Sequence, residues 1–208
     1  MRKSLLLVAF IVACSNVGVG QFILGRSDYW GKAVGIHPHG IYQRPIYWQF
    51  LLLEYRWSRL SIISEIAPFQ ISEVEYDNTV DRTVFSMIGL GIRIPLHTIS
   101  NTDKHLRLVS DLSIVYKKIW DDVFNEHYSL GLQSGSRLGT SYKILLEYDT
   151  KQFVMINLGM SYYTDWFAFG MRDRTNAQLW SYSGVYFSLK VNMSYFVKAI
   201  KDRYRGKK

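Results

Sequence analysis

Apolar and polar side chains alternate along most of the chain from about residue 45 onward. The last long segment shows the alternation best, and one of its faces carries Val185, Phe187, Leu189, Val191, Met193 and Tyr195. The opposite face carries Ser188, Lys190, Asn192 and Ser194. A period of two keeps such sets apart only in a β-strand, because a helix distributes both sets around its axis. We therefore predict a chain built from strands.

Eight segments show this alternation in stronger or weaker form, and we predict a strand in each. They are residues 45–56, 59–70, 84–96, 105–117, 127–135, 142–149, 154–162 and 184–196. Segments 30–42 and 165–171 could each add one strand, so the prediction is eight strands, or ten at most. The middle of segment 45–56 is apolar on both faces, so the pattern does not say which of its side chains share a face.

Turn-forming and charged residues separate the predicted strands. The predicted turns and loops are residues 57–58, 73–82, 97–103, 118–126, 136–139, 149–151 and 165–178. A series of strands joined in this way predicts an all-β fold, an antiparallel up-and-down β-barrel. In membrane barrels, long outer loops alternate with short inner turns, yet the predicted short turns at 136–139 and 149–151 are consecutive.

The N-terminal residues have the pattern of an export signal. Arg2 and Lys3 precede the apolar stretch Ser4–Ala13, and small residues follow. We predict cleavage after Gly20, and the alternative is lipid attachment at Cys14, the chain's one cysteine. The predicted organisation is a signal peptide over 1–20, a barrel domain over 21–197 and a basic tail over 198–208.

Later segments contain no run of eighteen apolar residues, so a membrane-spanning helix is not expected after the signal. If the exported chain crosses a bilayer, we expect it to do so with strands. Its net charge is +8, and removal of Arg2 and Lys3 leaves +6. Nucleic acid is not an expected partner of an exported chain. We expect outer-membrane lipid and lipopolysaccharide to be its acidic partners.

Alternation alone fits a membrane barrel with an apolar outside and equally a soluble, lipocalin-like barrel with an apolar inside. The polar faces carry charges of both signs in mid-strand, as expected of a salt-bridged lumen network. Its predicted members are Glu65, Arg93, Arg107, Asp111, Lys143, Glu147 and Lys190. Aromatic residues near strand ends predict girdles at the membrane interface, and they include Tyr47, Trp48, Trp57, Trp120, Tyr163 and Trp166. We therefore favour a transmembrane barrel, with the soluble ligand-binding barrel as an alternative.

Over residues 30–197 the chain resembles the small outer-membrane β-barrel proteins of Gram-negative bacteria. The resemblance is carried by the signal segment, the alternating strands and the final strand Gly184–Phe196, which ends in two aromatic residues. In that group an aromatic-ended last strand is recognised by the barrel-assembly machinery, so the resemblance implies this partner and an outer-membrane location. The architecture serves many functions, so no activity is implied by it.

One cluster has a catalytic appearance. His127 and Ser129 lie two residues apart on a predicted strand, so an imidazole could activate the hydroxyl, and Glu147 could orient the imidazole. The pair resembles the His-x-Ser of outer-membrane lipid A deacylases, which continue with Asn where this chain has Leu130. We favour the simpler interpretation of two polar lumen or rim residues.

Metal and cofactor sites are not predicted. His37-Pro38-His39 is interpreted as a polar turn, and the acidic segment 73–82 as a solvated loop without the spacing of a calcium loop. The predicted function is a non-enzymatic outer-membrane barrel with a structural, surface-interaction or narrow-pore role. The alternatives are a lipid A deacylase-like hydrolase and the soluble lipocalin-like barrel.

Overall fold

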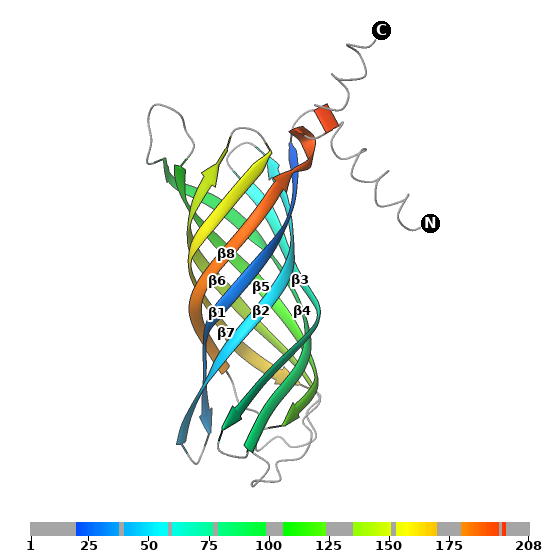
Figure 1. The fold of residues 1–208 in the computed structure, drawn as a ribbon, viewed down its shortest axis with the longest axis vertical. Helices are drawn as coiled ribbons and strands as arrows, with labels where there is room; N and C mark the ends of the chain where they lie inside the picture. Colours follow the sequence, from blue (N-terminus) through cyan, green and yellow to red (C-terminus); the bar gives the residue numbers. More distant parts are fainter. Residues whose placement is uncertain are drawn as a thin grey trace, which may run out of the picture.

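The chain folds into a closed barrel of eight antiparallel strands (Figure 1). This computed structural model describes residues 20–37, 40–57, 60–76, 79–98, 106–123, 135–150, 153–169, 180–195 and 197–198. The strands are β1 (Gln21–His37), β2 (Gly40–Trp57), β3 (Leu60–Tyr76), β4 (Thr79–Thr98), β5 (Leu106–Val123), β6 (Gly135–Asp149), β7 (Val154–Phe169) and β8 (Trp180–Asn192). In the part of the chain so described, no helix is long and apolar enough to cross a membrane.

Each strand pairs with its neighbours in the sequence, and β8 closes the barrel by pairing with β1. The closing ladder is continuous from Ile23 opposite Asn192 to Gly35 opposite Trp180. The start of β1 and the end of β8 lie at one end of the barrel, which we call the terminal end, and the opposite end is the distal end (Figure 1). The predicted all-β, up-and-down barrel of eight strands is therefore confirmed.

The outer surface of the barrel is apolar. Large exposed side chains include Ile62, Leu90, Ile92, Leu112, Ile114, Ile144, Leu158, Met160, Val185 and Leu189. Charged and polar side chains of the same strands are buried inside the barrel, for example Arg93, Asp111 and Lys143. An apolar belt on the outside and a polar lumen are the arrangement required of a barrel in lipid. The alternative of a soluble barrel with an apolar cavity facing inward along these strands is wrong.

The predicted count of eight strands is confirmed, but its members differ in two places. β1 covers residues 21–37, where the sequence pattern gave only an optional segment at 30–42 that spans the turn to β2. Predicted strand 127–135 lies outside the described residues except for Gly135, with which β6 begins. β1 is weakly patterned because Arg26 and Asp28 interrupt its outward apolar face.

Several predicted boundaries are also wrong, because strands extend past the apolar belt with polar sequences. Segment 73–82 was expected to be a loop, yet β3 and β4 continue through it up to a two-residue connection. Residues 165–169 extend β7 rather than forming an extra strand. The last strand ends at Asn192, before the predicted aromatic end, and residues 193–195 are helical.

The conflict over consecutive short turns is resolved by the observed pairing. Residues 136–139 lie inside β6, opposite β5 and β7, so they are not a turn. The connections at the terminal end are residues 58–59, 99–105 and 150–153, and the two longest connections, 124–134 and 170–179, lie at the distal end. The two longest connections are therefore both distal, but the other two distal connections, 38–39 and 77–78, are as short as 58–59, so long and short connections do not alternate strictly.

Candidate functional site

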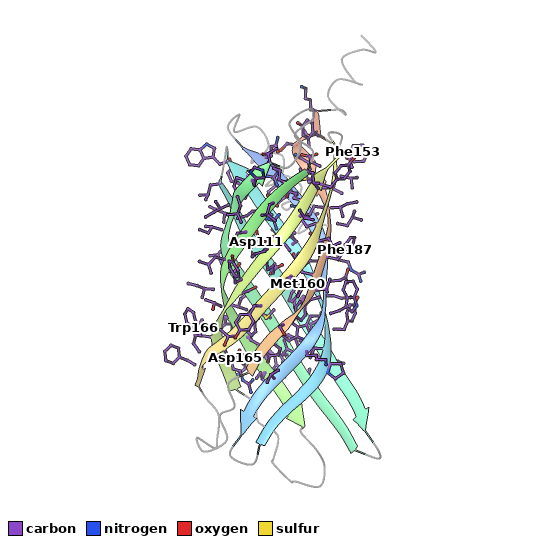
Figure 2. The ribbon with its side chains drawn as sticks, turned by 90° about the vertical axis from the view of Figure 1, so that its left-hand side faces the viewer. Asp111, Phe153, Met160, Asp165, Trp166 and Phe187 are labelled. Carbon is purple, nitrogen blue, oxygen red and sulfur yellow. The ribbon has the colours of Figure 1, made fainter. Side chains whose placement is uncertain are left out.

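The interior of the barrel is divided into two layers of different chemistry. Toward the terminal end lies a charged layer, which we define by Glu54, Arg56, Arg93, Arg107, Asp111, Glu147 and Lys190. Toward the distal end lies an aromatic layer, which we define by Tyr29, Trp48, Phe50, Phe85, Tyr163 and Tyr182. Figure 2 shows Asp111 and Asp165 in these two halves of the barrel. Both layers arise from the same alternation, since successive inward positions of each strand step along the barrel axis.

Four strands supply the centre of the charged layer. Lys190 Nζ of β8 lies 2.8 Å from Glu54 Oε2 of β2 and 2.6 Å from Glu147 Oε2 of β6. From β4, Arg93 donates from Nη1 to Glu54 Oε2 at 2.8 Å. All four residues are at most 2% exposed. The side chains of β2, β4, β6 and β8 therefore meet across the lumen and fill it.

Further ion pairs surround this centre. Arg93 binds Asp111 in a bidentate way, with Nε to Oδ1 at 2.6 Å and Nη2 to Oδ2 at 2.7 Å. Arg56 Nη2 bridges Glu54 at 2.7 Å and Glu147 at 2.9 Å, and Arg107 also donates to Glu147. Burial of an unpaired charge is very unfavourable, so a plug of this kind requires nearly balanced charges. Four cations face three carboxylates here, and every carboxylate oxygen of Glu147 accepts from a cation.

A second ion pair lies between the two layers. Lys143 donates to Glu65 across the barrel, and the Tyr186 hydroxyl donates to the other oxygen of Glu65 at 2.7 Å. The Lys143 ammonium also lies 4.6 Å from the centre of the Tyr186 ring, a cation–π distance. These contacts connect β3, β6 and β8.

The aromatic layer is built around Trp48. Its ring centroid is 4.7 Å from Tyr182, 5.3 Å from Phe85 and 5.4 Å from Tyr29, in tilted or edge-on arrangements that aromatic pairs prefer. Lys117 reaches into this layer, where its ammonium lies 4.4 Å from the Tyr182 ring centroid and donates to the Tyr182 hydroxyl. Beside it, Asp165 accepts from Arg137 at 3.1 Å and from the Tyr163 hydroxyl at 2.6 Å. Cations and rings thus fill the distal half together.

The structure brings all seven predicted lumen residues to the interior. Arg93, Arg107, Asp111, Glu147 and Lys190 meet in the charged layer, while Glu65 and Lys143 form the separate pair. The prediction omits Glu54 and Arg56, because the apolar run at 50–53 hides which face they share. Trp48, Phe50 and Leu52 occupy the inward positions of β2. The same alternation, continued toward the end of the strand, would have placed Glu54 and Arg56 inside the barrel.

Two of the predicted girdle residues are wrong. Trp48 and Tyr163 lie inside the barrel, 4% and 3% exposed, because they occupy inward positions of β2 and β7. Other members of the predicted girdles are exposed on the outside, including Tyr47, Trp57, Trp120 and Trp166. Figure 2 shows Trp166 and Phe153 on the outer side, near opposite ends of the apolar belt. Aromatic residues at both levels are typical of a membrane-spanning barrel.

Of the three candidate catalytic residues, the structure describes Glu147 alone. His127 and Ser129 lie outside the described residues, so their geometry stays a prediction. Glu147 lies in the charged layer, where four cationic side chains surround it. Its observed contacts are those of a structural ion-pair network.

The chain is similar to known proteins in its fold. No family model matches the sequence, and no curated protein matches it. Among solved structures, Neisserial surface protein A (NspA) matches with a TM-score of 0.53 and 12% identity, over 82% of this chain and 96% of that one. The outer membrane protein OprG from Pseudomonas aeruginosa matches with a TM-score of 0.50 and 12% identity, over 83% and 96% of the two chains. At these identities the likeness concerns the fold.

A third match is weaker. Ail, the attachment invasion locus protein of Yersinia pestis, has a TM-score of 0.47 and 10% identity, over 81% of this chain and 97% of Ail. The comparisons give no support to the resemblance to lipid A deacylases. The chain therefore shares the eight-stranded barrel fold of NspA and OprG, and its apolar exterior around a polar lumen is that of a barrel that spans a membrane.

Proposed function

We propose that this barrel does not conduct and acts as a non-enzymatic structural or surface-interaction protein of the outer membrane. The observation that supports this proposal is the charged layer, in which Glu54, Arg93, Glu147 and Lys190 meet across the lumen. Side chains fill the interior of a barrel of eight strands, so no continuous water path is expected. The narrow-pore role is therefore the less favoured form of the sequence prediction.

Conductance in planar bilayers tests this proposal. We expect purified, refolded protein to produce no stable current steps at voltages where a general porin, measured in parallel, opens readily. A heat-modifiability gel of the same sample would verify that the barrel is folded in the bilayer. Regular single-channel steps from folded protein would contradict the proposal.

Lipopolysaccharide is the partner that the outer surface suits best. Lys32 lies two residues after the exposed Trp30, and the Lys118 ammonium lies 5.8 Å from the Trp120 ring centroid. Arg26 also points outward, with 60% of its side chain exposed. Cations beside girdle aromatics suit the phosphate groups of a lipid whose acyl chains contact the apolar belt. Assembly by the barrel-assembly machinery is part of the same proposal.

The lipid contact can be measured with matched variants. We expect purified lipopolysaccharide to raise the temperature at which the barrel unfolds on a heat-modifiability gel. The increase should be smaller in the double variant Lys32→Ala, Lys118→Ala, because two phosphate partners are lost. Lys198→Ala is the control, since this exposed lysine follows β8 at the terminal end. An equal increase in all three proteins would contradict the assignment of the phosphates to Lys32 and Lys118.

The non-enzymatic part of the proposal has its own test. Ser129→Ala should leave the acyl-chain composition of lipid A unchanged in cells that express the protein, as measured by mass spectrometry. Cells that lack the gene provide the reference. Loss of an acyl chain that depends on the protein and on Ser129 would show that the barrel is an enzyme.

A further inference from the structure

The barrel wall is incomplete between β2 and β3. The ladder between these strands runs only from Trp57 opposite Leu60 to Leu51 opposite Ile66. Both strands continue toward the distal end, where β2 stays paired with β1 down to His37 opposite Gly40, and β3 stays paired with β4 down to Tyr76 opposite Thr79. In Figures 1 and 2 the β1–β2 and β3–β4 hairpins diverge at the distal end. We call this unpaired stretch between residues 45–50 and 67–71 the gap.

Backbone chemistry on the β2 side explains where the ladder stops. The amide of Gln49 faces β3 but donates to the side-chain oxygen of Gln70, 3.2 Å away, in place of a carbonyl of the backbone. Amides of a strand alternate in direction, so residue 45 also faces β3, and Pro45 has no N–H to donate. Proline within a sheet is confined to edges and bulges. On the β2 side, two of the donors that a longer ladder would need are therefore missing or used by a side chain.

A β-bulge does the same on the β3 side. The register with β4 shifts between Ala67 and Gln70, which leaves Pro68 and Phe69 outside the ladder. The bulge is fixed in place, since Ser86 Oγ donates to the Pro68 carbonyl at 2.6 Å and accepts from Trp120 Nε1 at 2.9 Å. Bulges bend the strand that contains them, so β3 turns away from β2 at this point.

The gap leads to the aromatic layer. Trp48 and Phe50, from the unpaired part of β2, line a small internal cavity together with Met87, Val115 and Tyr163. On β3 the first inward residue of the gap is Ala67, whose side chain is the smallest available to a non-glycine residue. We call the two strand edges that border the gap, one on β2 and one on β3, its lips. Exposed apolar side chains on the β3 lip include Phe69 and Ile71, each 57% exposed. Apart from Gln49 and Gln70, the side chains at the gap are therefore mainly apolar, and the cavity behind it is apolar around Trp48 and polar where Glu65 and Lys143 line it.

The height of the gap in the membrane follows from the girdle around it. Tyr47 lies on its β2 lip and stacks on Trp30 with ring centroids 5.4 Å apart, and Trp120 is bonded through Ser86 to the bulge on its β3 lip. Aromatic residues of this kind mark the membrane interface. The gap thus opens at the distal interface, where the belt meets the headgroups.

We propose that the gap is a lateral portal through which a small apolar molecule dissolved in the membrane enters the aromatic layer and binds beside Trp48. A strand from a second protein is not the expected occupant, because Pro45 and Pro68 remove donors that strand addition requires. Ions and sugars do not suit the apolar lips. On the terminal side of the aromatic layer, the charged layer closes the lumen. The portal therefore leads to a binding site and not to a route across the membrane. This inference goes beyond the proposed structural or surface role.

Quenching of Trp48 fluorescence by 1-bromohexane tests the portal. The protein is a Cys14→Ser variant in which Trp30, Trp57, Trp120, Trp166 and Trp180 are replaced by Phe, so that Trp48 is the one tryptophan left. Gln49→Cys and Gln70→Cys are added and joined by a short bismaleimide linker across the gap. The control pair Leu53→Cys, Ser64→Cys receives the same linker where the strands are already paired. Samples labelled with N-ethylmaleimide carry similar bulk without the bridge.

We expect 1-bromohexane in lipid nanodiscs to quench Trp48 strongly in the unbridged protein. Quenching should fall several-fold when Gln49→Cys and Gln70→Cys are bridged and should be unchanged in the bridged control pair. Equal quenching in the two bridged proteins would overturn the portal, because the probe would then reach Trp48 by another way. Weak quenching in the unbridged protein would overturn it as well.

Amide hydrogen exchange on the unaltered protein tests the gap without any variant. The Tyr47 amide faces the gap, whereas the Trp48 amide at the same height faces the complete β1 ladder. We expect Tyr47 to exchange at least ~10-fold faster than Trp48, since exchange reports the local opening of hydrogen bonds. Equal protection would show that β3 or a strand of a second copy covers the edge, and it would overturn the proposal. A dimer by native mass spectrometry would identify the second copy.

Discussion

The two halves of the lumen differ in how their contents are held. In the charged layer, cations and carboxylates from β2, β4, β5, β6 and β8 are joined by short, buried ion pairs within complete ladders. In the aromatic layer, large rings pack around Trp48 behind a wall that is incomplete between β2 and β3. One barrel can therefore combine a rigid plug at the terminal end with an adaptable, apolar half at the distal end. Variants of each layer should differ in size and kind of effect.

The largest effect is expected from removal of a carboxylate in the charged layer. Glu147→Leu leaves Arg56, Arg107 and Lys190 without one of their partners, and of these Lys190 is fully buried. Breaking a buried ion pair from one side costs about 3–5 kcal/mol. Urea unfolding in detergent micelles, followed by the heat-modifiability shift, measures this loss.

A matched pair of variants distinguishes lost charge from lost volume. Glu147→Gln keeps the shape of the side chain and removes its charge, so it should be almost as destabilising as the leucine variant. Ile144→Ala, at an exposed position of the same strand, serves as the control for a lipid-facing site. If Glu147→Leu were no worse than Ile144→Ala, the charged layer would not be the rigid half.

The aromatic layer should respond to volume instead. Trp48→Ala removes the ring that contacts Tyr29, Phe85 and Tyr182, and such a truncation costs about 3 kcal/mol in a closed core. Trp48→Phe should cost less than about 1.5 kcal/mol, because it keeps an aromatic ring and the buried Trp48 Nε1 has no hydrogen-bond partner among the described residues. The same urea titration measures both variants. A phenylalanine variant as unstable as the alanine variant would show that the indole nitrogen matters after all.

The comparison of the layers also explains what the sequence could predict. Arg93 and Lys143 stand alone between apolar neighbours, so alternation identifies them as inward residues without knowledge of the fold. Alternation does not identify Trp48 and Tyr163 as inward residues, since an aromatic side chain fits an interfacial girdle and a lumen equally well. Only the parity of the whole strand distinguishes the two, and β2 hides its parity in an apolar run.

The alternation of apolar and polar residues does not predict the register between neighbouring strands. Pairing of Arg93 with Glu54, and of Lys190 with both Glu54 and Glu147, depends on how far each strand is shifted against the next. The extensions of β3, β4 and β5 past the apolar belt carry charges, so their sequences are typical of loops, and backbone pairing holds them as strands. Prolines at 45 and 68 are visible in the sequence, but their effect on the β2–β3 ladder is evident only from the pairing.

We expect Pro45→Thr to have the smallest effect on stability of these variants. It is also the most direct test of the incomplete wall between β2 and β3. Threonine restores an N–H that faces β3 and favours extended backbone, so it permits the ladder to lengthen toward the distal end. The free energy of unfolding should change by less than about 0.5 kcal/mol, since the bulge at Pro68 still bends β3 away. Exchange at the Tyr47 amide should nevertheless slow if the new donor draws the two lips together. Unchanged exchange in Pro45→Thr and slower exchange in Pro68→Thr would assign the incomplete wall to the bulge alone, because only the second change would then have restored pairing.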